Sequence, residues 1–198
     1  MKRAVGRPPR SEDEISEFRE TVASRALEIY KAEGFDAVSM RRLAKDVGCS
    51  ATTLYAHFES KTGILMHLWG HILEEMSEEI LAELEQVSEP VARLKTAIES
   101  FIGYWVDHPD HFRLVFMSND VGRLDVDSFL DMTKTQAHFA LFRNLVAASL
   151  GKGENVGAKT DVLVANMIGA ALCYNTIKNY PWPSPSVMIS HYIDGVIP

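Results

Sequence analysis

Residues 39–61 constrain the fold of this 198-residue chain more than any other stretch, because they encode two short helices and the turn between them. Ser39 is suited to an N-cap, since its hydroxyl can accept a hydrogen bond from a first-turn amide. Gly48 stands where a helix that ends sharply needs a left-handed residue. Ser50 can cap a second helix, in which apolar residues recur four positions apart. The stretch therefore predicts two amphipathic helices around a tight turn.

Two capped helices around a glycine turn resemble a DNA-binding helix-turn-helix. Over roughly residues 20–66 the chain is similar to the N-terminal domain of the tetracycline-repressor (TetR) family. In that family a Gly-aromatic step precedes a Ser/Thr-capped helix, and a Ser-x-x-Thr-Leu-Tyr-x-His/Tyr-Phe-x-x-Lys string follows. Thr52 departs mildly, because its position is often glycine or another small residue in the family. The residues that fill the pattern are Gly34, Phe35, Ser39, Ser50, Thr53, Leu54, Tyr55, His57, Phe58 and Lys61.

The resemblance implies which residues contact DNA. Small side chains at positions 51–53 let the second helix enter a major groove ~12 Å wide, where threonine can touch base edges. In TetR-like proteins the positions of Tyr55, His57 and Lys61 commonly hold backbone phosphates. For Tyr55, packing on the first helix is the alternative. The expected DNA-binding set is Ser39, Arg41, Ser50, Ala51, Thr52, Thr53, Tyr55, His57, Lys61 and Arg7.

Arg7 belongs to a basic N-terminal arm, residues 1–10, with four Lys/Arg side chains and no acid. Two prolines and a glycine oppose a helix there, so we expect an extended segment. Gly6-Arg7-Pro8 resembles the minor-groove clasp of AT-hook peptides. A disordered leader that only aids solubility is the alternative interpretation.

The net charge of −7 is unevenly distributed along the chain. Residues 1–67 hold eleven Lys/Arg against ten Asp/Glu, whereas residues 68–198 hold nine against seventeen. The N-terminal part can therefore approach phosphate while the acidic remainder stays away from it. We find no apolar run near the ~20 residues of a membrane span and no secretory signal. The two distant cysteines suit free thiols, so we expect a cytoplasmic protein.

Helical periodicity without strand alternation predicts an all-α fold of nine helices. Three helices form a helix-turn-helix domain over residues 11–62, and roughly six form an effector-binding and dimerisation domain over residues 63–198. A loop is expected at 119–125. The helices after the helix-turn-helix are expected at about 60–87, 90–108, 112–117, 129–150, 159–180 and 186–196.

The aromatic residues of the second domain admit two interpretations. Each one suits a packed core, but together they can line an apolar cavity, as resemblance to ligand-responsive regulators implies. Polar residues that can orient a ligand are His108, Gln136, His138, Asn166 and Asn175. The expected ligand-binding set is Trp69, Phe101, Tyr104, Trp105, Phe116, His138, Phe142 and Tyr174.

The resemblance also implies a homodimer through the last two helices, 158–180 and 186–196, where small residues suit close packing. We therefore expect a sequence-specific transcription regulator that binds a double-stranded DNA operator. A repressor released from a palindromic operator by an unidentified small apolar effector is the leading interpretation. Control by a protein partner is the alternative, and an enzyme that uses the aromatic cavity is the third.

Neither catalysis nor a cofactor is expected. Residues 151–154 lack the spacing of a phosphate loop, and the histidines lack a sequence-local nucleophile. His67 and His71, one helical turn apart, have no obvious further metal ligands, so an ordinary amphipathic face is the better interpretation.

Overall fold

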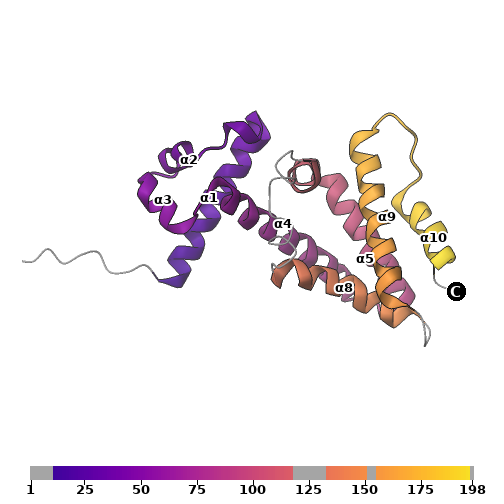
Figure 1. Cartoon of the computed structure of the whole chain (residues 1–198). Helices are drawn as coiled ribbons and strands as arrows, with labels where there is room; N and C mark the ends of the chain where they lie inside the picture. Colours follow the sequence, from indigo (N-terminus) through magenta and orange to yellow (C-terminus); the bar gives the residue numbers. More distant parts are fainter. Residues whose placement is uncertain (1–10, 118–132, 151–154, 197–198) are drawn as a thin grey trace, which may run out of the picture. The chain divides into compact units, whose positions relative to one another are not determined.

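The computed structural model describes residues 11–117, 133–150 and 155–196. It divides into two compact units, Met1–Leu68 and Trp69–Pro198. Within the described ranges every regular element is a helix and none is a strand (Figure 1). The predicted all-α fold, with an N-terminal helix-turn-helix and a helical C-terminal part, is therefore confirmed. The arm of residues 1–10, with Arg7, and the loop expected at 119–125 lie outside the described residues.

Local capping determines where the helices of the first unit begin and end. The first helix starts with a capping box, in which the Ser11 hydroxyl accepts from the Glu14 amide at 3.2 Å and the Ser11 amide donates to the Glu14 carboxylate at 2.8 Å. The helix ends at Gly34, whose φ of 83° favours glycine. The elements are α1 (Glu12–Glu33), a 3-10 turn (Phe35–Ala37), α2 (Met40–Asp46), α3 (Ala51–His57) and α4 (Lys61–Leu84).

The helix-turn-helix is built as the sequence predicts. The Ser39 hydroxyl accepts from the Arg42 amide, and the Ser50 hydroxyl accepts from the Thr53 amide at 3.0 Å. Gly48, between α2 and α3, has a φ of 72°. Apolar residues of α1, α2, α3 and the start of α4 pack into one core, so the buried face of α3 is fixed against the other helices. That core comprises Val22, Ala26, Ile29, Val38, Met40, Leu43, Ala44, Leu54, Phe58 and Ile64.

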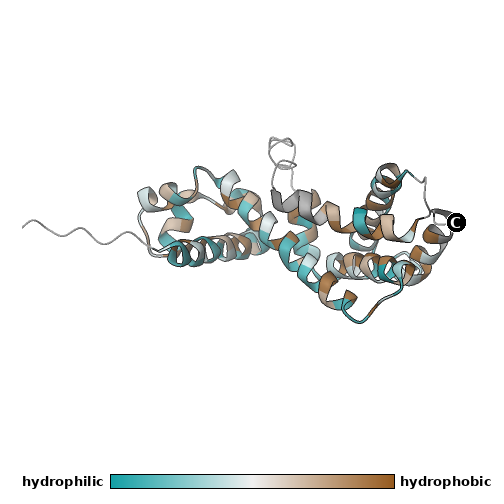
Figure 2. Cartoon of the chain, turned by 90° about the horizontal axis from the view of Figure 1, so that it is seen from below, coloured by the Kyte–Doolittle hydropathy of each residue, from teal (hydrophilic) through white to brown (hydrophobic). Residues whose placement is uncertain are grey.

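In the second unit, one central helix contacts most of the others. Helix α5 packs against α8, α9 and α10, and α8 also packs against α9 (Figure 1). Hydrophobic and hydrophilic residues alternate along the helices of each unit, as expected for amphipathic helices (Figure 2). The elements are α5 (Pro90–Asp107), α6 (Pro109–Phe112), a π-helical turn (Arg113–Met117), α8 (Thr133–Ser149), α9 (Val156–Thr176) and α10 (Pro185–Val196).

Two helices end earlier than predicted. Helix α4 ends at Leu84, where the Arg93 guanidinium caps the helix. It donates hydrogen bonds to the carbonyl oxygens of Leu84 at 2.7 Å and Val87 at 2.6 Å. Helix α9 stops at Thr176, where the Trp182 indole donates to the Ile177 carbonyl at 3.0 Å. These contacts come from residues that follow the helices, so periodicity inside the helices could not indicate them.

The expectation that no segment is apolar and long enough to cross a membrane needs a correction at α9. By length and composition alone, this 21-residue helix could cross a membrane, because small and apolar residues make up much of it. One such helix is weak evidence for a membrane span, since core helices of soluble proteins pass the same test. Only 28% of its most apolar window is buried, so α9 presents an apolar face that the described part of this chain does not cover.

Candidate nucleic-acid interface

Helix α3 presents a small, uncharged face to solvent. Ala51, Thr52 and Tyr55 are exposed, Tyr55 to 54%, while Leu54 on the opposite side is fully buried. The exposure of Tyr55 argues against the alternative that it packs on α1. Thr53 is half-buried, and its hydroxyl lies 2.8 Å from that of Ser50. The face can enter a groove and touch base edges, but it cannot neutralise phosphate.

Basic side chains at the edge of this face come from α2. Arg41 and Lys45, one helical turn apart, are both exposed. Ser39 is exposed at the N-terminus of the same helix, although its hydroxyl already accepts from the Arg42 amide at 3.3 Å. Arg41 and Lys45 provide the positive charge that binding to a phosphate backbone requires.

Two other arginines of this unit are engaged in an ion-pair network between α1 and α2. The Arg42 guanidinium donates to both carboxylate oxygens of Glu33, at 2.8 and 2.5 Å. Arg25 binds Asp46 at 3.0 Å and Glu28 at 2.6 Å. The bond from Arg42 holds the pKa of Glu33 below its ordinary value. This network fixes α2 against α1, which leaves phosphate binding on α2 to Arg41 and Lys45.

Lys61, expected to bind phosphate, lies against the protein in this structure. Its Nζ donates to the Phe35 carbonyl at 2.5 Å and sits 3.3 Å from the centroid of the Phe35 ring. The contact ties the first residue of α4 to the turn between α1 and α2. Phosphate contact by Lys61 stays a prediction, and it requires the ammonium to leave or share this carbonyl.

The C-terminal end of α3 is fastened to α1 by residues that sequence analysis did not identify. The Arg19 guanidinium donates to the His57 carbonyl at 3.2 Å and lies 5.7 Å from the centre of the Phe58 ring. The His57 ring packs on Phe18, with centroids 4.7 Å apart. His57 is therefore half-buried, although it was expected at a phosphate. Helical spacing could not identify Arg19, because its partner is 38 residues away.

His67, considered above with His71 as a metal pair, binds an acidic residue instead. Its Nε2 lies 3.0 Å from a carboxylate oxygen of Glu20 in α1. Within the described ranges, no three His, Cys, Asp or Glu side chains are grouped so that they could hold a metal ion.

Five members of the expected ligand-binding set come together in the second unit. The Trp105 ring contacts those of Phe101 at 6.0 Å, Tyr104 at 5.2 Å and Phe116 at 5.1 Å, and Phe142 contacts Phe101 at 5.7 Å. Trp105 is fully buried, and its Nε1 has no hydrogen-bond partner among the described residues. We call these five residues the aromatic cluster.

The other three members of that set lie differently. Trp69 is also buried in the interior. Tyr174 is held at the end of α9, where its hydroxyl donates to the Pro183 carbonyl at 2.5 Å and its ring faces Trp182. Burial raises the pKa of Tyr174. His138 lies within α8, but its side chain is outside the described part of the structure.

One member of the aromatic cluster, Tyr104, forms a buried polar pair with His111. The Tyr104 hydroxyl lies 2.9 Å from Nδ1 of His111 and 3.4 Å from the Ile72 carbonyl of α4. Burial, followed by the charge of Glu75, raises the pKa of Tyr104, so the hydroxyl stays protonated and can donate. His108 stacks on His111 with ring centroids 5.1 Å apart. His111, which sequence analysis passed over, is therefore the histidine in contact with this hydroxyl.

Comparison with known proteins identifies the class. Residues 23–68 match the family described as bacterial regulatory proteins, tetR family. The HTH-type transcriptional regulator HbdR of Aromatoleum sp. (strain CIB) is 21% identical over 137 residues, which cover 69% of this chain and 60% of HbdR. The matched region thus spans less than two thirds of that relative.

Two solved structures share the fold. That of regulatory protein SCO4313 has a TM-score of 0.73 at 13% identity and covers 96% of this chain and 99% of its own. That of the transcriptional regulator FadR from Bacillus subtilis in complex with stearoyl-CoA has a TM-score of 0.71 at 11% identity and covers 90% and 97%. At these identities the likeness concerns the fold alone. Residues 23–68 therefore form a helix-turn-helix domain of the tetR family of bacterial regulatory proteins, and the whole chain shares the fold of these solved structures.

Proposed function

We propose that this protein is a cytoplasmic, homodimeric repressor that a small apolar effector releases from a palindromic operator. The observation that carries the proposal is the exposed face of α3, which combines Ala51, Thr52 and Tyr55 with Arg41 and Lys45 of the neighbouring helix. A small uncharged face can approach base edges, and the neighbouring cations of α2 can bind phosphates of the adjacent backbone.

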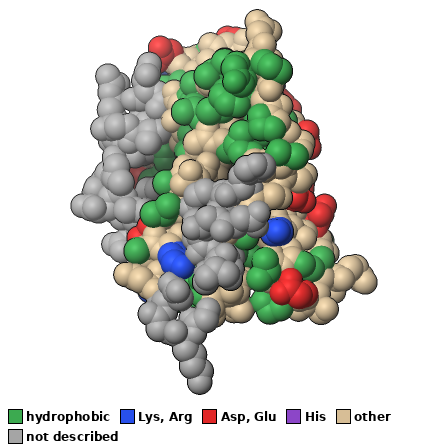
Figure 3. Space-filling model, turned by 90° about the vertical axis from the view of Figure 1, so that its right-hand side faces the viewer, with side chains coloured by type: hydrophobic (Ala, Val, Ile, Leu, Met, Phe, Trp, Pro, Cys, Tyr) green, Lys and Arg blue, Asp and Glu red, His purple; other side chains and the backbone are tan. Residues whose placement is uncertain are grey.

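Dimerisation is supported by an uncovered apolar face on α9 and its connection to α10. Leu172, Ile177 and Tyr180 are large hydrophobic residues that are all more than two-fifths exposed. On the side of the molecule that carries α9 and α10, hydrophobic side chains gather near the top, where Figure 1 places that connection (Figure 3). A two-fold dimer needs one self-complementary patch, and two such patches would cover each other.

Regulation by an effector is supported by the aromatic cluster and its contact with α4. Tyr104 reaches the Ile72 carbonyl of α4, the helix that begins with Lys61 in the DNA-binding unit. A ligand at the cluster that binds the DNA-incompetent state more tightly would shift α4 and release the operator. FadR from Bacillus subtilis, which has the same fold, was solved with stearoyl-CoA. This supports a small-molecule effector over the alternative of a protein partner.

Thr52→Ala tests sequence readout. We expect it to weaken binding to the operator, selected from a random DNA library, by about 1–3 kcal/mol, because base-edge contacts carry discrimination. Binding to unrelated DNA should change much less. The measurement is a fluorescence-anisotropy titration on both DNAs, with Thr21→Ala, an exposed threonine of α1, as the control. An equal loss on both DNAs would mean that Thr52 only positions the domain.

Arg41→Ala and Lys61→Ala test the phosphate contacts. Each should weaken operator and unrelated DNA alike and lower the slope of log affinity against log salt by about one. Lys31→Ala is the matched control, because Lys31 is an exposed cation in the last turn of α1 and lies outside the expected DNA-binding set. If Lys61→Ala lowers thermal stability but leaves the slope unchanged, its bond to Phe35 is structural and the phosphate assignment is wrong.

A further inference from the structure

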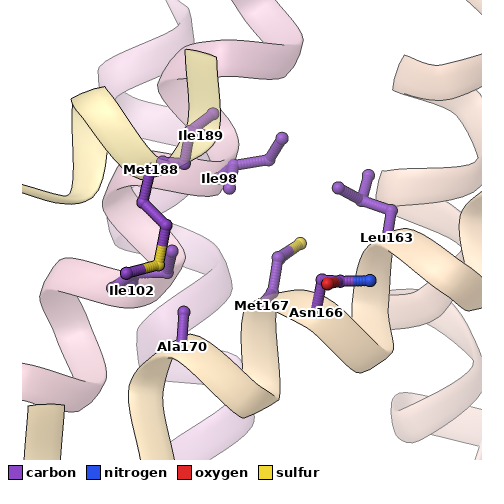
Figure 4. Close-up of a pocket in the computed structure, with 8 residues that line it drawn as sticks. All are labelled: Ile98, Ile102, Leu163, Asn166, Met167, Ala170, Met188 and Ile189. Atoms are coloured by element: carbon purple, nitrogen blue, oxygen red, sulfur yellow. The ribbon is translucent and has the colours of Figure 1, made fainter. Parts of the chain in front are cut away.

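A cavity in the second unit is lined by residues outside the aromatic cluster. It has a volume of about 330 Å³ and lies between α5, α9 and α10 (Figure 4). None of its lining residues belongs to the ligand-binding set expected from the sequence. The lining includes Ile98 and Ile102 of α5, Asn166, Met167 and Ala170 of α9, and Met188 of α10.

The cavity opens to solvent at Asn166, which is exposed, so it is a surface pocket and not a packing defect. Close-packed protein interiors leave few voids larger than a water molecule, whereas small-molecule sites typically occupy ~300–1,000 Å³. A space of about 330 Å³ has room for about ten groups of the size of water. Such a volume suits a single aromatic ring with small substituents or a short branched aliphatic chain.

The lining determines the chemistry of the ligand. Ile98, Ile102 and Met167 are buried aliphatic or thioether side chains, and Figure 4 shows Met188 of α10 reaching toward Ile102. No charged residue lines the cavity within the described part of the chain. An anion such as a phosphate or carboxylate would therefore lose its hydration without a counter-charge. The flexible methionines allow the walls to adapt to ligands of different shapes.

Asn166 is the polar residue among the described lining residues, and it can orient a ligand in the cavity. The Asn166 amide nitrogen donates to the Val162 carbonyl of its own helix at 2.8 Å. That bond fixes the amide, so its oxygen is the atom that can accept a hydrogen bond from a ligand. A hydroxyl or N–H group on an otherwise apolar molecule fits this arrangement.

We propose that the cavity between α5, α9 and α10 is a binding site for a small, uncharged, mostly apolar molecule with one hydrogen-bond donor. The proposal goes beyond the proposed function, because this cavity is separate from the aromatic cluster, and any effect of the site on operator binding rests on that function. Ligand binding is tested without DNA, so a chain that does not bind the ligand is distinguishable from a chain that does not bind the operator.

The probe is phenol, titrated into the full chain labelled with ¹³C at the methionine methyl groups. Phenol has few atoms, so we expect a Kd of about 1 mM. The methyl signals of Met167 and Met188 should shift together and saturate, while that of Met40 in the DNA-binding unit stays in place. Absence of a saturable shift at about 10 mM phenol, or a shift confined to other methionines, would overturn the proposal.

Two variants show whether the probe occupies this cavity. Ala170→Leu fills it with a side chain and should weaken phenol binding at least about tenfold, whereas Ala158→Leu, exposed on the same helix, should leave it unchanged. Asn166→Ala should weaken phenol by a few-fold to about tenfold but leave benzene unaffected, because benzene makes no hydrogen bond.

Far-UV circular dichroism and a cooperative thermal transition establish that each variant is folded. Unchanged phenol affinity in folded Ala170→Leu contradicts the site. If Ala170→Leu does not fold, Asn166→Ala decides, because equal loss or no loss for phenol and benzene contradicts the predicted hydrogen bond.

Discussion

Trp105→Ala should lower the free energy of unfolding by about 3–5 kcal/mol, the range for removing a large aromatic side chain from a packed core. Trp105 is fully buried, and its ring contacts four other aromatic rings, those of Phe101, Tyr104, Phe112 and Phe116. Few neighbours can move to fill the space, so the loss should lie in the upper part of this range. Urea denaturation measures it as a shift of the midpoint at constant slope.

Trp105→Phe separates packing from hydrogen bonding. The indole N–H has no partner among the described residues, so phenylalanine loses ring volume but no hydrogen bond. We expect a cost well below that of alanine. Tyr180→Ala, at a residue 56% exposed, is the surface control and should stay within about 0.5 kcal/mol of the wild type. A Trp105→Ala loss no larger than that of the control would show that the cluster is loosely packed.

Burial also changes how the effector response has to be probed. Periodicity places Trp69 on the inner face of α4, which suggests Trp69→Ala as a probe that leaves folding intact. The structure contradicts that use, because Trp69 is only 1% exposed and its removal would destabilise the fold. Substitutions at the half-buried Phe116, at the edge of the cluster, disturb the core less.

The helix-turn-helix could be predicted from sequence because its determinants are local. The capping box of Ser11 and Glu14, the glycines at 34 and 48, and the caps Ser39 and Ser50 each act within about four residues. The chemistry of the caps Ser39 and Ser50 is specific enough to predict the beginnings of α2 and α3 from the sequence.

Contacts between helices could not be predicted in the same way. Lys61 and Phe35 are 26 residues apart, and Arg42 binds Glu33 across the turn that joins α1 to α2. Periodicity shows which residues face solvent, but it does not show which exposed charges meet. Arg42 and Arg41 are indistinguishable in sequence, yet one is held in an ion pair and the other is exposed. The cavity beside Asn166 depends likewise on how three helices pack.

The second large effect concerns the apolar face of α9. Leu172→Glu should convert the dimer to monomers, because a carboxylate would have to be buried without a partner at the proposed interface. Operator affinity should then fall about 10²–10⁴-fold, since two half-sites are no longer bound by linked domains. Leu172 is 42% exposed, so the folded monomer should tolerate the change. Sedimentation velocity and operator titration measure the two effects.

Leu81→Glu is the matched control, because Leu81 is a leucine of α4 that is 49% exposed and outside α9 and α10. It should leave both the mass and the operator affinity unchanged. Val187→Glu on α10 and Phe139→Glu on α8 then show which helix joins α9 in the interface, since both residues are exposed hydrophobics. An interface through the last two helices predicts that Val187→Glu dissociates the dimer and Phe139→Glu does not. The reverse result would place α8 beside α9 at the two-fold axis, and a dimer that survives Leu172→Glu would move the interface off this face of α9.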